Sequence, residues 1–368
     1  MKSKRIGEIE IWRFIFCIVI ILYHCNTRIF MQLGRDDYSL AWSPRGYIGV
    51  EFFFMLSGYF MVSGIMKMQE AKQSRGALYV RYMWGKYISV FPYHIIAFMT
   101  IFIRQCIILK GFSLNLLLKN LPEMFLVQRM GFRYYNLNSV EWYLAAMLLA
   151  MAVILPLAMK FRDVYFKYLA PLSAILIYGW LIHENGKLGN IHVWTSAGFI
   201  CVWRAVAGLN LGMFANQCVR ALSKYDFSKK EQVTAHVIRF VLWGTVLVFA
   251  FLMYPKKYEV TLVLLMFLAL VLTFVFTPKN SERLSSSFVM FLGKMSLPLY
   301  LNQMFVIKIV ISLDLGLSEG WTVLVVLVSD FIISLPCYFG GNALLKLMKN
   351  SRLNKMIMGL EPTVKRQL

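Results

Sequence analysis

The sequence predicts an all-α fold, a polytopic transmembrane helical bundle with both termini in the cytoplasm. Hydrophobic residues make up 59% of the chain and charged residues 15%, whereas soluble domains average about 45–50% and about 25%. Mean hydropathy is +0.62. Apolar runs of about 20 residues, each long enough to cross a bilayer, recur along the chain. Basic residues gather in the segments between these runs.

The apolar runs predict about ten membrane spans. They cover approximately residues 11–30, 46–66, 87–108, 140–159, 164–183, 197–214, 235–254, 259–277, 295–312 and 321–345. The first run is too long for a cleavable signal peptide and contains Arg13, and no small-residue cleavage site follows it. We therefore expect one integral-membrane domain over residues 1–368, with no appended soluble domain.

The distribution of lysine and arginine sets the orientation. With a cytoplasmic N-terminus and ten spans, about 24 of these residues lie inside and about 10 outside, as the positive-inside rule requires. An odd number of spans would place the basic C-terminal tail outside. The bias therefore favours an even number of spans, with both termini in the cytoplasm.

The net charge of +21 and the six cysteines have simple explanations. The basic residues lie in loops between apolar runs, so anionic lipid headgroups are more plausible partners than nucleic acid. The cysteines show no C-x-x-C spacing and mostly lie inside apolar runs, which is typical of small core residues rather than of metal ligands or disulfides.

Ionisable groups inside the spans are the main indicators of function, because a charge at mid-bilayer costs roughly 2.5–3.5 kcal/mol on insertion scales. Arg239 and Lys308 lie close enough to span ends to reach the interface. The full set is Arg13, His24, Glu51, His94, Arg104, Glu141, Arg204, Arg239, Lys308 and Asp330, with Asn210, Asn302 and Gln303 as further polar groups.

Arg13 and His24 form the most informative pair. They are eleven residues apart in the first span, which is about three helical turns or roughly 16 Å, so both project from nearly the same helix face. Arginine suits phosphate, and histidine suits taking a proton near neutral pH. The spacing fits a long phosphorylated donor that enters from the cytoplasm and places its reactive end at His24. Taken singly, Arg13 could reach the interface and His24 could be a core histidine.

Several segments resemble the membrane-bound acyltransferase 3 family. "EIWRFIFCIVIILYH" carries its hallmark of arginine, ten residues and histidine, with Glu10 where an aspartate is usual. "GYIGVEFFFMLSGYFMV" is similar to its second-span signature, and "LGKMSLPLYLNQMFV" to its late Gly-x-x-Ser-x-x-x-Tyr-Leu-x-His segment. Three further segments resemble family motifs and lie, in the family's order, between the second-span and late segments: "YVRYMWGKYISVFPYH", "VEWYLAAMLLAMAVILP" and "RAVAGLNLGMF". Two positions depart from the pattern, because Ser89 replaces a base and Gln303 replaces the late histidine.

The resemblance implies transfer of an acyl group, often acetyl from acetyl-CoA, to a hydroxyl of a carbohydrate or related envelope molecule, without a metal. It also implies a bacterial cytoplasmic (inner) membrane location. His24 would be the general base, Glu10 would hold Arg13, and Glu51 would orient His24. Arg13, Arg81 and Lys86 would bind the phosphates of the acyl-CoA donor. The acceptor side would use Glu141, Trp142, Arg204, Tyr300, Asn302 and Gln303.

Other interpretations remain at this stage. Glu51 could be an interfacial carboxylate, Arg81 and Lys86 ordinary cytoplasmic charges, and Trp142 part of an aromatic belt. We assign Ser57 and Gly58 to helix packing. The competing class is a transporter of a small polar or anionic solute, although the repeated halves typical of transporters are not visible. The sequence leaves open the acceptor, the acyl group and the oligomeric state, for which a homodimer is one alternative.

Overall fold

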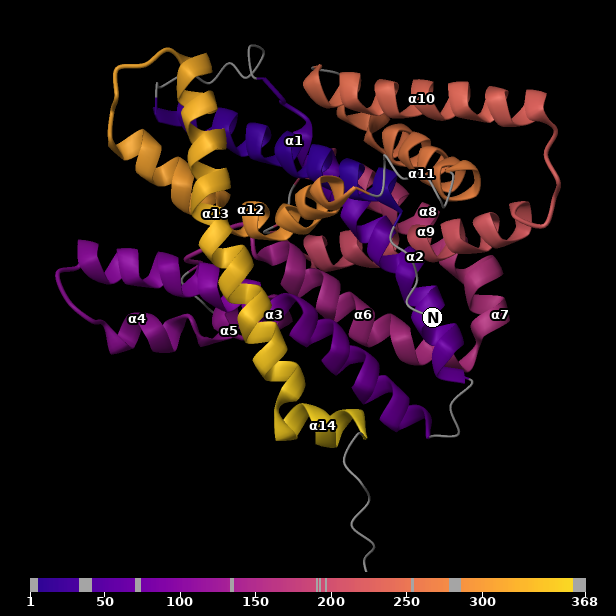
Figure 1. Cartoon of the computed structure of the whole chain (residues 1–368), viewed down its shortest axis with the longest axis horizontal. Helices are drawn as coiled ribbons and strands as arrows, with labels where there is room; N and C mark the ends of the chain where they lie inside the picture. Colours follow the sequence, from indigo (N-terminus) through magenta and orange to yellow (C-terminus); the bar gives the residue numbers. More distant parts are fainter. Residues whose placement is uncertain are drawn as a thin grey trace, which may run out of the picture.

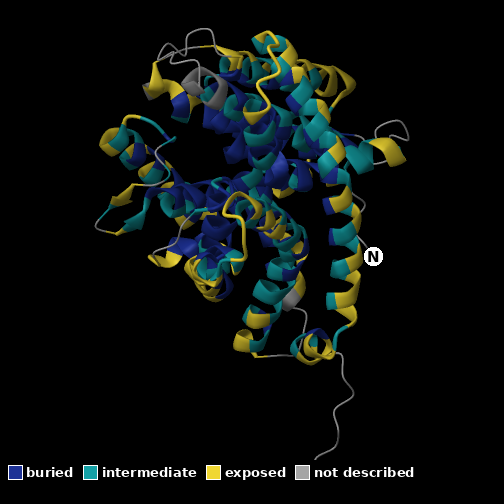
Figure 2. Cartoon of the chain, turned by 90° about the vertical axis from the view of Figure 1, so that its left-hand side faces the viewer, coloured by how far each residue is buried: buried dark blue, intermediate teal, exposed yellow. Residues whose placement is uncertain are grey.

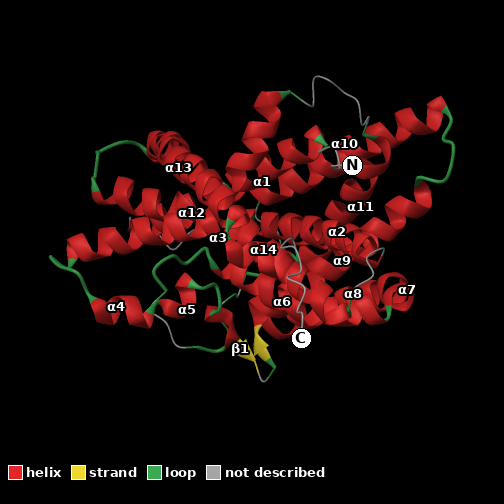
Figure 3. Cartoon of the chain, turned by 60° about the horizontal axis from the view of Figure 1, so that its bottom comes forward, coloured by secondary structure: helices red, strands yellow, loops and turns green. Residues whose placement is uncertain are grey.

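The computed structural model describes residues 6–32, 42–69, 74–132, 136–189, 191, 193–195, 197–252, 255–277 and 286–359. Most of them are helical (Figures 1 and 3), and the strands β1 (Trp194–Thr195) and β2 (Gly198–Phe199) form one small antiparallel hairpin. The predicted all-α membrane bundle is confirmed. The helices are α1 (Gly7–Gln32), α2 (Gly49–Gln69), α3 (Arg75–Ile108), α4 (Leu114–Lys119), α5 (Leu121–Met124), α6 (Trp142–Lys160), α7 (Arg162–Val164), α8 (Ala170–Asn185), α9 (Ile200–Leu222), α10 (Lys229–Phe251), α11 (Glu259–Phe276), α12 (Ser287–Ser312), α13 (Glu319–Asn350) and α14 (Arg352–Met358).

Eight helical segments in the described part of the chain are long and apolar enough to cross a membrane. The other two predicted spans correspond to α1 and α9, which are long helices with charged or amide side chains among their apolar residues. α1 carries Glu8, Glu10 and Arg13, and α9 carries the buried Arg204 and the two buried amides Asn210 and Asn216. The charges of these two helices therefore need partners inside the bundle.

Helix α3 begins earlier than the sequence pattern indicated. The predicted spans 46–66 and 87–108 leave 67–86 as a polar connection between them, but α3 starts at Arg75, with the Ser74 side chain accepting a hydrogen bond from the Ala77 backbone N–H. The helix has 34 residues, about 50 Å at the usual rise, which exceeds a hydrocarbon core of about 30 Å. Its basic first turns extend beyond the apolar layer, so hydropathy alone does not detect them.

Two helix pairs build the centre of the bundle. α1 packs against α12, and α2 packs against α9. The second pair makes backbone contact, because a Cβ atom at Gly58 would overlap the Leu209 carbonyl and one at Gly212 would overlap the Met55 carbonyl. The predicted packing role of Gly58 is confirmed. Figure 2 shows buried residues gathered in the middle of the bundle, with exposed residues along its outer helices and loops.

Candidate active site

A cavity of about 480 Å³ lies between α1, α2, α3, α6 and α12, within the range of about 300–1,000 Å³ typical of ligand sites. It contains the predicted donor-binding cations Arg13 and Lys86. Its further lining residues are Glu10, Val50, Phe53, Leu56, Ser57, Phe60, Ser89, Val90, Tyr143, Leu144, Met147, Ser296, Leu297 and Tyr300. The cavity therefore combines a charged region with aromatic and aliphatic walls.

Arg13 and Glu10 form the ion pair expected from the sequence. The Arg13 guanidinium lies 3.0 Å from a Glu10 carboxylate oxygen, one turn away on α1. Glu10 is buried against α12, where a side chain at Gly293 would overlap its carboxylate. In the part of the chain that the structure describes, no carboxylate pairs with Lys86. With Glu10 neutralising Arg13, the ammonium of Lys86 leaves the cavity with an excess positive charge.

His24 lies further along the same α1–α12 interface. Its Nδ1 atom is 2.9 Å from Oε1 of Gln303 on α12. His24 is not among the residues that line the cavity, but Tyr300 is. Tyr300 and Gln303 are one turn apart on α12, about 4.5 Å along the axis. The inner end of the cavity therefore lies about one helical turn from the partner of His24.

Glu51 does not orient His24 as predicted. Its two carboxylate oxygens accept hydrogen bonds from the Arg204 guanidinium and the Tyr178 hydroxyl. Arg204 also donates to the backbone carbonyls of Leu188 and Tyr47, at 3.0 and 2.8 Å. Because this cluster joins α2, α8 and α9 in the bundle interior, the local contacts of Glu51 and Arg204 are structural.

Trp142 packs against this cluster, since its ring lies 5.5 Å from the Arg204 guanidinium carbon in a cation–π contact. Trp142 is buried and therefore does not form part of an interfacial aromatic belt. Trp142 does not line the cavity, although the next residue, Tyr143, does. A direct contact of Trp142 or Arg204 with an acceptor stays a prediction.

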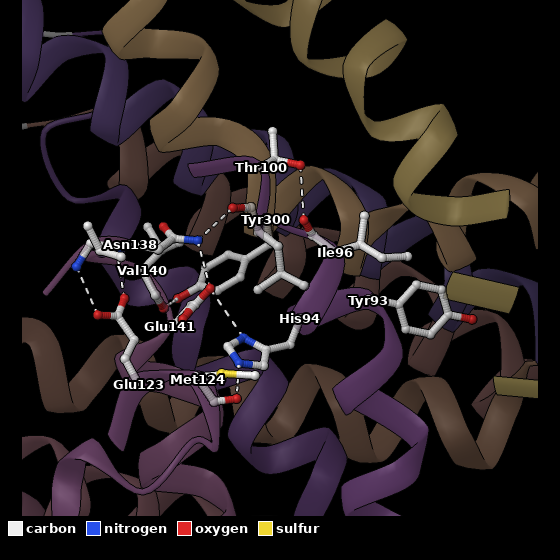
Figure 4. A network of polar contacts seen from close by, with 12 residues as sticks. Tyr93, His94, Ile96, Thr100, Glu123, Met124, Asn138, Val140, Glu141 and Tyr300 are labelled. Carbon is white, nitrogen blue, oxygen red and sulfur yellow. Dashed lines mark hydrogen bonds and ion pairs between the residues drawn. The ribbon is translucent and has the colours of Figure 1, made fainter. Parts of the chain in front are cut away.

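Glu141 belongs to a second buried polar cluster, shown in Figure 4. His94 of α3 points its Nδ1 at the Glu141 carboxylate, 3.2 Å away, and its Nε2 lies 3.0 Å from the Met124 carbonyl. Asn138 donates to both Glu141 and the Leu301 carbonyl of α12. The sequence pattern marked His94 only as an ionisable group inside a span, because its partners belong to α5 and to the residue that caps α6.

Glu123 of α5 completes the cluster and lies outside the membrane-spanning segments. Its carboxylate accepts hydrogen bonds from the backbone N–H groups of Leu137 and Asn138, at 2.8 and 2.6 Å. Burial, reinforced by the nearby Glu141 carboxylate, raises the pKa of Glu123 from 4.5 to about 8, against the opposing effect of the two N–H groups. Glu123 was not predicted from the sequence, because it lies in a polar segment between two spans, where a carboxylate is ordinary.

Arg81 and Asn302 also lie outside the cavity lining. Arg81 Nε donates to the carbonyl of Ile357 in α14, 3.1 Å away, so this side chain anchors the C-terminal helix to α3. Asn302 donates to the Pro298 carbonyl of its own helix at 2.9 Å. Of the three predicted donor-binding cations, the cavity thus brings together Arg13 and Lys86 but not Arg81.

A comparison with protein-family models assigns the chain to a family. The model of the acyltransferase 3 family, described as an acyltransferase domain, matches residues 6–339. The chain belongs to the acyltransferase 3 family. No curated protein and no solved structure gives a significant match. Membership favours acyl transfer over the transporter alternative, and together with the long apolar helices it indicates an integral, multi-pass membrane acyltransferase.

Proposed function

We propose that this acyltransferase transfers an acyl group, acetyl in the simplest case, from cytoplasmic acyl-CoA to a hydroxyl of a carbohydrate or other molecule of the bacterial envelope. One observation carries the proposal: a cavity with Arg13 and Lys86 in its wall reaches Tyr300, one turn from the glutamine that holds His24. Guanidinium and ammonium groups both bind phosphate. The donor's phosphates would lie at the two cations, with the acyl group directed along α12 toward His24.

His24 supplies the base that a hydroxyl nucleophile needs. As the acceptor oxygen attacks the thioester carbonyl, the imidazole takes the hydroxyl proton, since a hydroxyl is a poor nucleophile at neutral pH. The carbon–sulfur bond then breaks, and the CoA sulfur leaves and receives that proton. The products are the O-acylated acceptor and free CoA. Glu10 contributes indirectly, because its ion pair fixes the direction of the Arg13 guanidinium.

The test separates donor binding from chemistry. Acetyl-CoA is titrated calorimetrically into purified wild type, His24→Ala, Lys86→Met and Lys294→Met, and CoA release is followed in native membranes. His24→Ala should bind acetyl-CoA with wild-type affinity but release no CoA above background. Lys86→Met should bind it roughly ten- to hundredfold more weakly, as expected for loss of a charged hydrogen bond. Lys294 is an exposed lysine of α12 that does not line the cavity, so Lys294→Met is the matched control.

Two results would overturn the proposal. Wild type that fails to bind acetyl-CoA would remove the donor assignment. CoA release by His24→Ala at the wild-type rate would remove His24 as the base.

A further inference from the structure

Gln303 is completely buried, and each end of its side-chain amide has a defined neighbour. Nε2 lies 2.8 Å from the Tyr300 carbonyl oxygen, and Oε1 lies 2.9 Å from His24 Nδ1. A backbone carbonyl can only accept a hydrogen bond, so the amide NH₂ must face Tyr300. The amide oxygen, which also only accepts, must then face His24. The network therefore decides the orientation of the amide.

This orientation determines the proton position on His24. A ring nitrogen that faces an acceptor must carry a hydrogen, so Nδ1 is protonated. A neutral imidazole has only one N–H, and its lone pair is then on Nε2. We propose that Gln303 is a positioning residue that holds His24 in the Nδ1–H tautomer and makes Nε2 the atom that accepts the hydroxyl proton. The inference rests on the proposed function of His24 as the base.

The turn of α12 that leads into Gln303 is anchored by two hydrogen bonds. The Tyr300 hydroxyl donates to the Val140 carbonyl at 2.6 Å, and Asn138 donates to the Leu301 carbonyl at 2.9 Å. These bonds tie α12 to the segment just before α6, so the residue whose carbonyl holds the Gln303 amide is itself fixed in place. A histidine at position 303, as in the resembling family pattern, could present either a donor or an acceptor. Glutamine held by Tyr300 presents only an acceptor.

The experiment reads the tautomer directly. The chain has five histidines, so protein labelled with ¹⁵N only in histidine rings gives a simple solid-state NMR spectrum. The His24 signals are those missing from His24→Ala. The spectra are recorded at about pH 8, above the ordinary histidine pKa of about 6.5, so that the ring is neutral. Size-exclusion profiles and circular dichroism show which variants keep the fold.

Three variants test the role of Gln303. Gln303→Glu keeps an acceptor of the same length, whereas Gln303→Leu removes it. Asn342→Leu is the matched control, because Asn342 also donates to its own helix, at the Tyr338 carbonyl, and accepts from a neighbouring helix, at the Tyr93 hydroxyl. Wild type, Gln303→Glu and Asn342→Leu should show His24 protonated on Nδ1. Gln303→Leu should show a mixture of tautomers, with kcat lowered roughly tenfold, as for one neutral hydrogen bond, and an unchanged KM for acetyl-CoA.

The inference is wrong if wild-type His24 carries its proton on Nε2, or if folded Gln303→Leu keeps the wild-type tautomer and kcat. Because the NMR signal requires no turnover, it decides the tautomer even if the proposed transfer reaction fails. Failure of the inference and failure of the proposed function are therefore distinguishable.

Discussion

Arg13 has two partners to satisfy, Glu10 within the protein and the proposed phosphate in the cavity. A lysine at this position could still pair with Glu10, but its single ammonium group cannot make the two-point contact that a guanidinium makes with phosphate. Arg13→Lys should therefore weaken CoA binding roughly ten- to hundredfold. Calorimetric titration of CoA measures this. Arg220→Lys is the control, since Arg220 is exposed near the end of α9 and outside this cavity. Equal affinities for wild type and Arg13→Lys would limit Arg13 to pairing with Glu10.

The raised pKa of Glu123 predicts that the stability of the folded protein depends on pH. The Glu123 carboxyl has a pKa near 4.5 when unfolded and about 8 when folded, so the folded state holds a proton over a range in which the unfolded chain has lost it. The stability contributed by the protonated group is fully present below pH 4.5 and is lost as the pH rises toward about 8. Glu123→Gln cannot titrate, so its melting temperature should fall less than that of wild type across this window.

Wild type and Glu123→Gln must be compared by how steeply their melting temperatures change with pH, not by the melting temperature at a single pH. Glutamine places an NH₂ group against one of the two backbone N–H donors, at Leu137 or Asn138, and should therefore lower stability at every pH. The difference between wild type and Glu123→Gln should shrink from pH 4.5 to 8. Glu184→Gln, at a side chain that is 52% exposed, should follow the wild-type slope. Parallel curves for wild type and Glu123→Gln would show that Glu123 stays charged in the folded protein.

Local spacing predicted some of these contacts and missed others. The Arg13–Glu10 pair was predictable because the two residues are one turn apart on one helix. The His24–Gln303 and Glu51–Arg204 contacts join residues 279 and 153 positions apart, so only the packing of helices creates them. The carboxylate of Glu51 pairs with the buried Arg204 and therefore does not contact His24. A charge pattern within one span cannot identify a partner on another.

At the scale of single helices, hydropathy located the elements well and their ends less well. All ten predicted spans correspond to helices, but α3 extends from Arg75 and α13 continues to Asn350, where charged turns leave the apolar layer. The polar segment 109–139 also contains α4 and α5, which are too short to give a clear periodic signal. Small residues within the spans were more informative than hydropathy about which helix surfaces meet.

The α2–α9 contact gives a test at this scale. Alanine normally stabilises a helix relative to glycine by about 0.5–1 kcal/mol. At Gly58 the added methyl would overlap the Leu209 carbonyl, so Gly58→Ala should lower the melting temperature despite the better helix propensity. At Gly179 on α8 nothing lies within 4 Å of the new atom, and Gly179→Ala should maintain or raise it. A stabilising Gly58→Ala would mean that the two backbones are not in contact.

For the molecule as a whole, the directions of packed helices support ten crossings. Contacts between α1 and α12 run in the same order on both helices, from Cys17 with the Ser296 carbonyl to His24 with Gln303, so these helices are parallel. Trp180 meets Trp203 while Ser173 meets Asn210, so α8 and α9 are antiparallel. If all ten helices cross, the first and ninth spans share a direction and the fifth and sixth oppose each other. The observed directions agree with ten crossings. α9 is then one of the ten, although it is not among the eight segments whose composition marks them as apolar enough to cross a membrane.

The route of the donor depends on this topology, because acyl-CoA reaches the Arg13 end of the cavity from the cytoplasm only if that end faces inward. Two exposed serines allow a matched test: Ser223 follows α9, on the predicted cytoplasmic side, and Ser318 precedes α13, on the predicted outer side. In sealed cells a membrane-impermeant maleimide should label Ser318→Cys above the parent protein but leave Ser223→Cys unlabelled. Permeabilised cells should label both, which shows that each thiol is reactive. Labelling of Ser223→Cys in sealed cells would reverse the orientation and open the cavity's charged end to the outside, where a cytoplasmic acyl-CoA donor could not reach it.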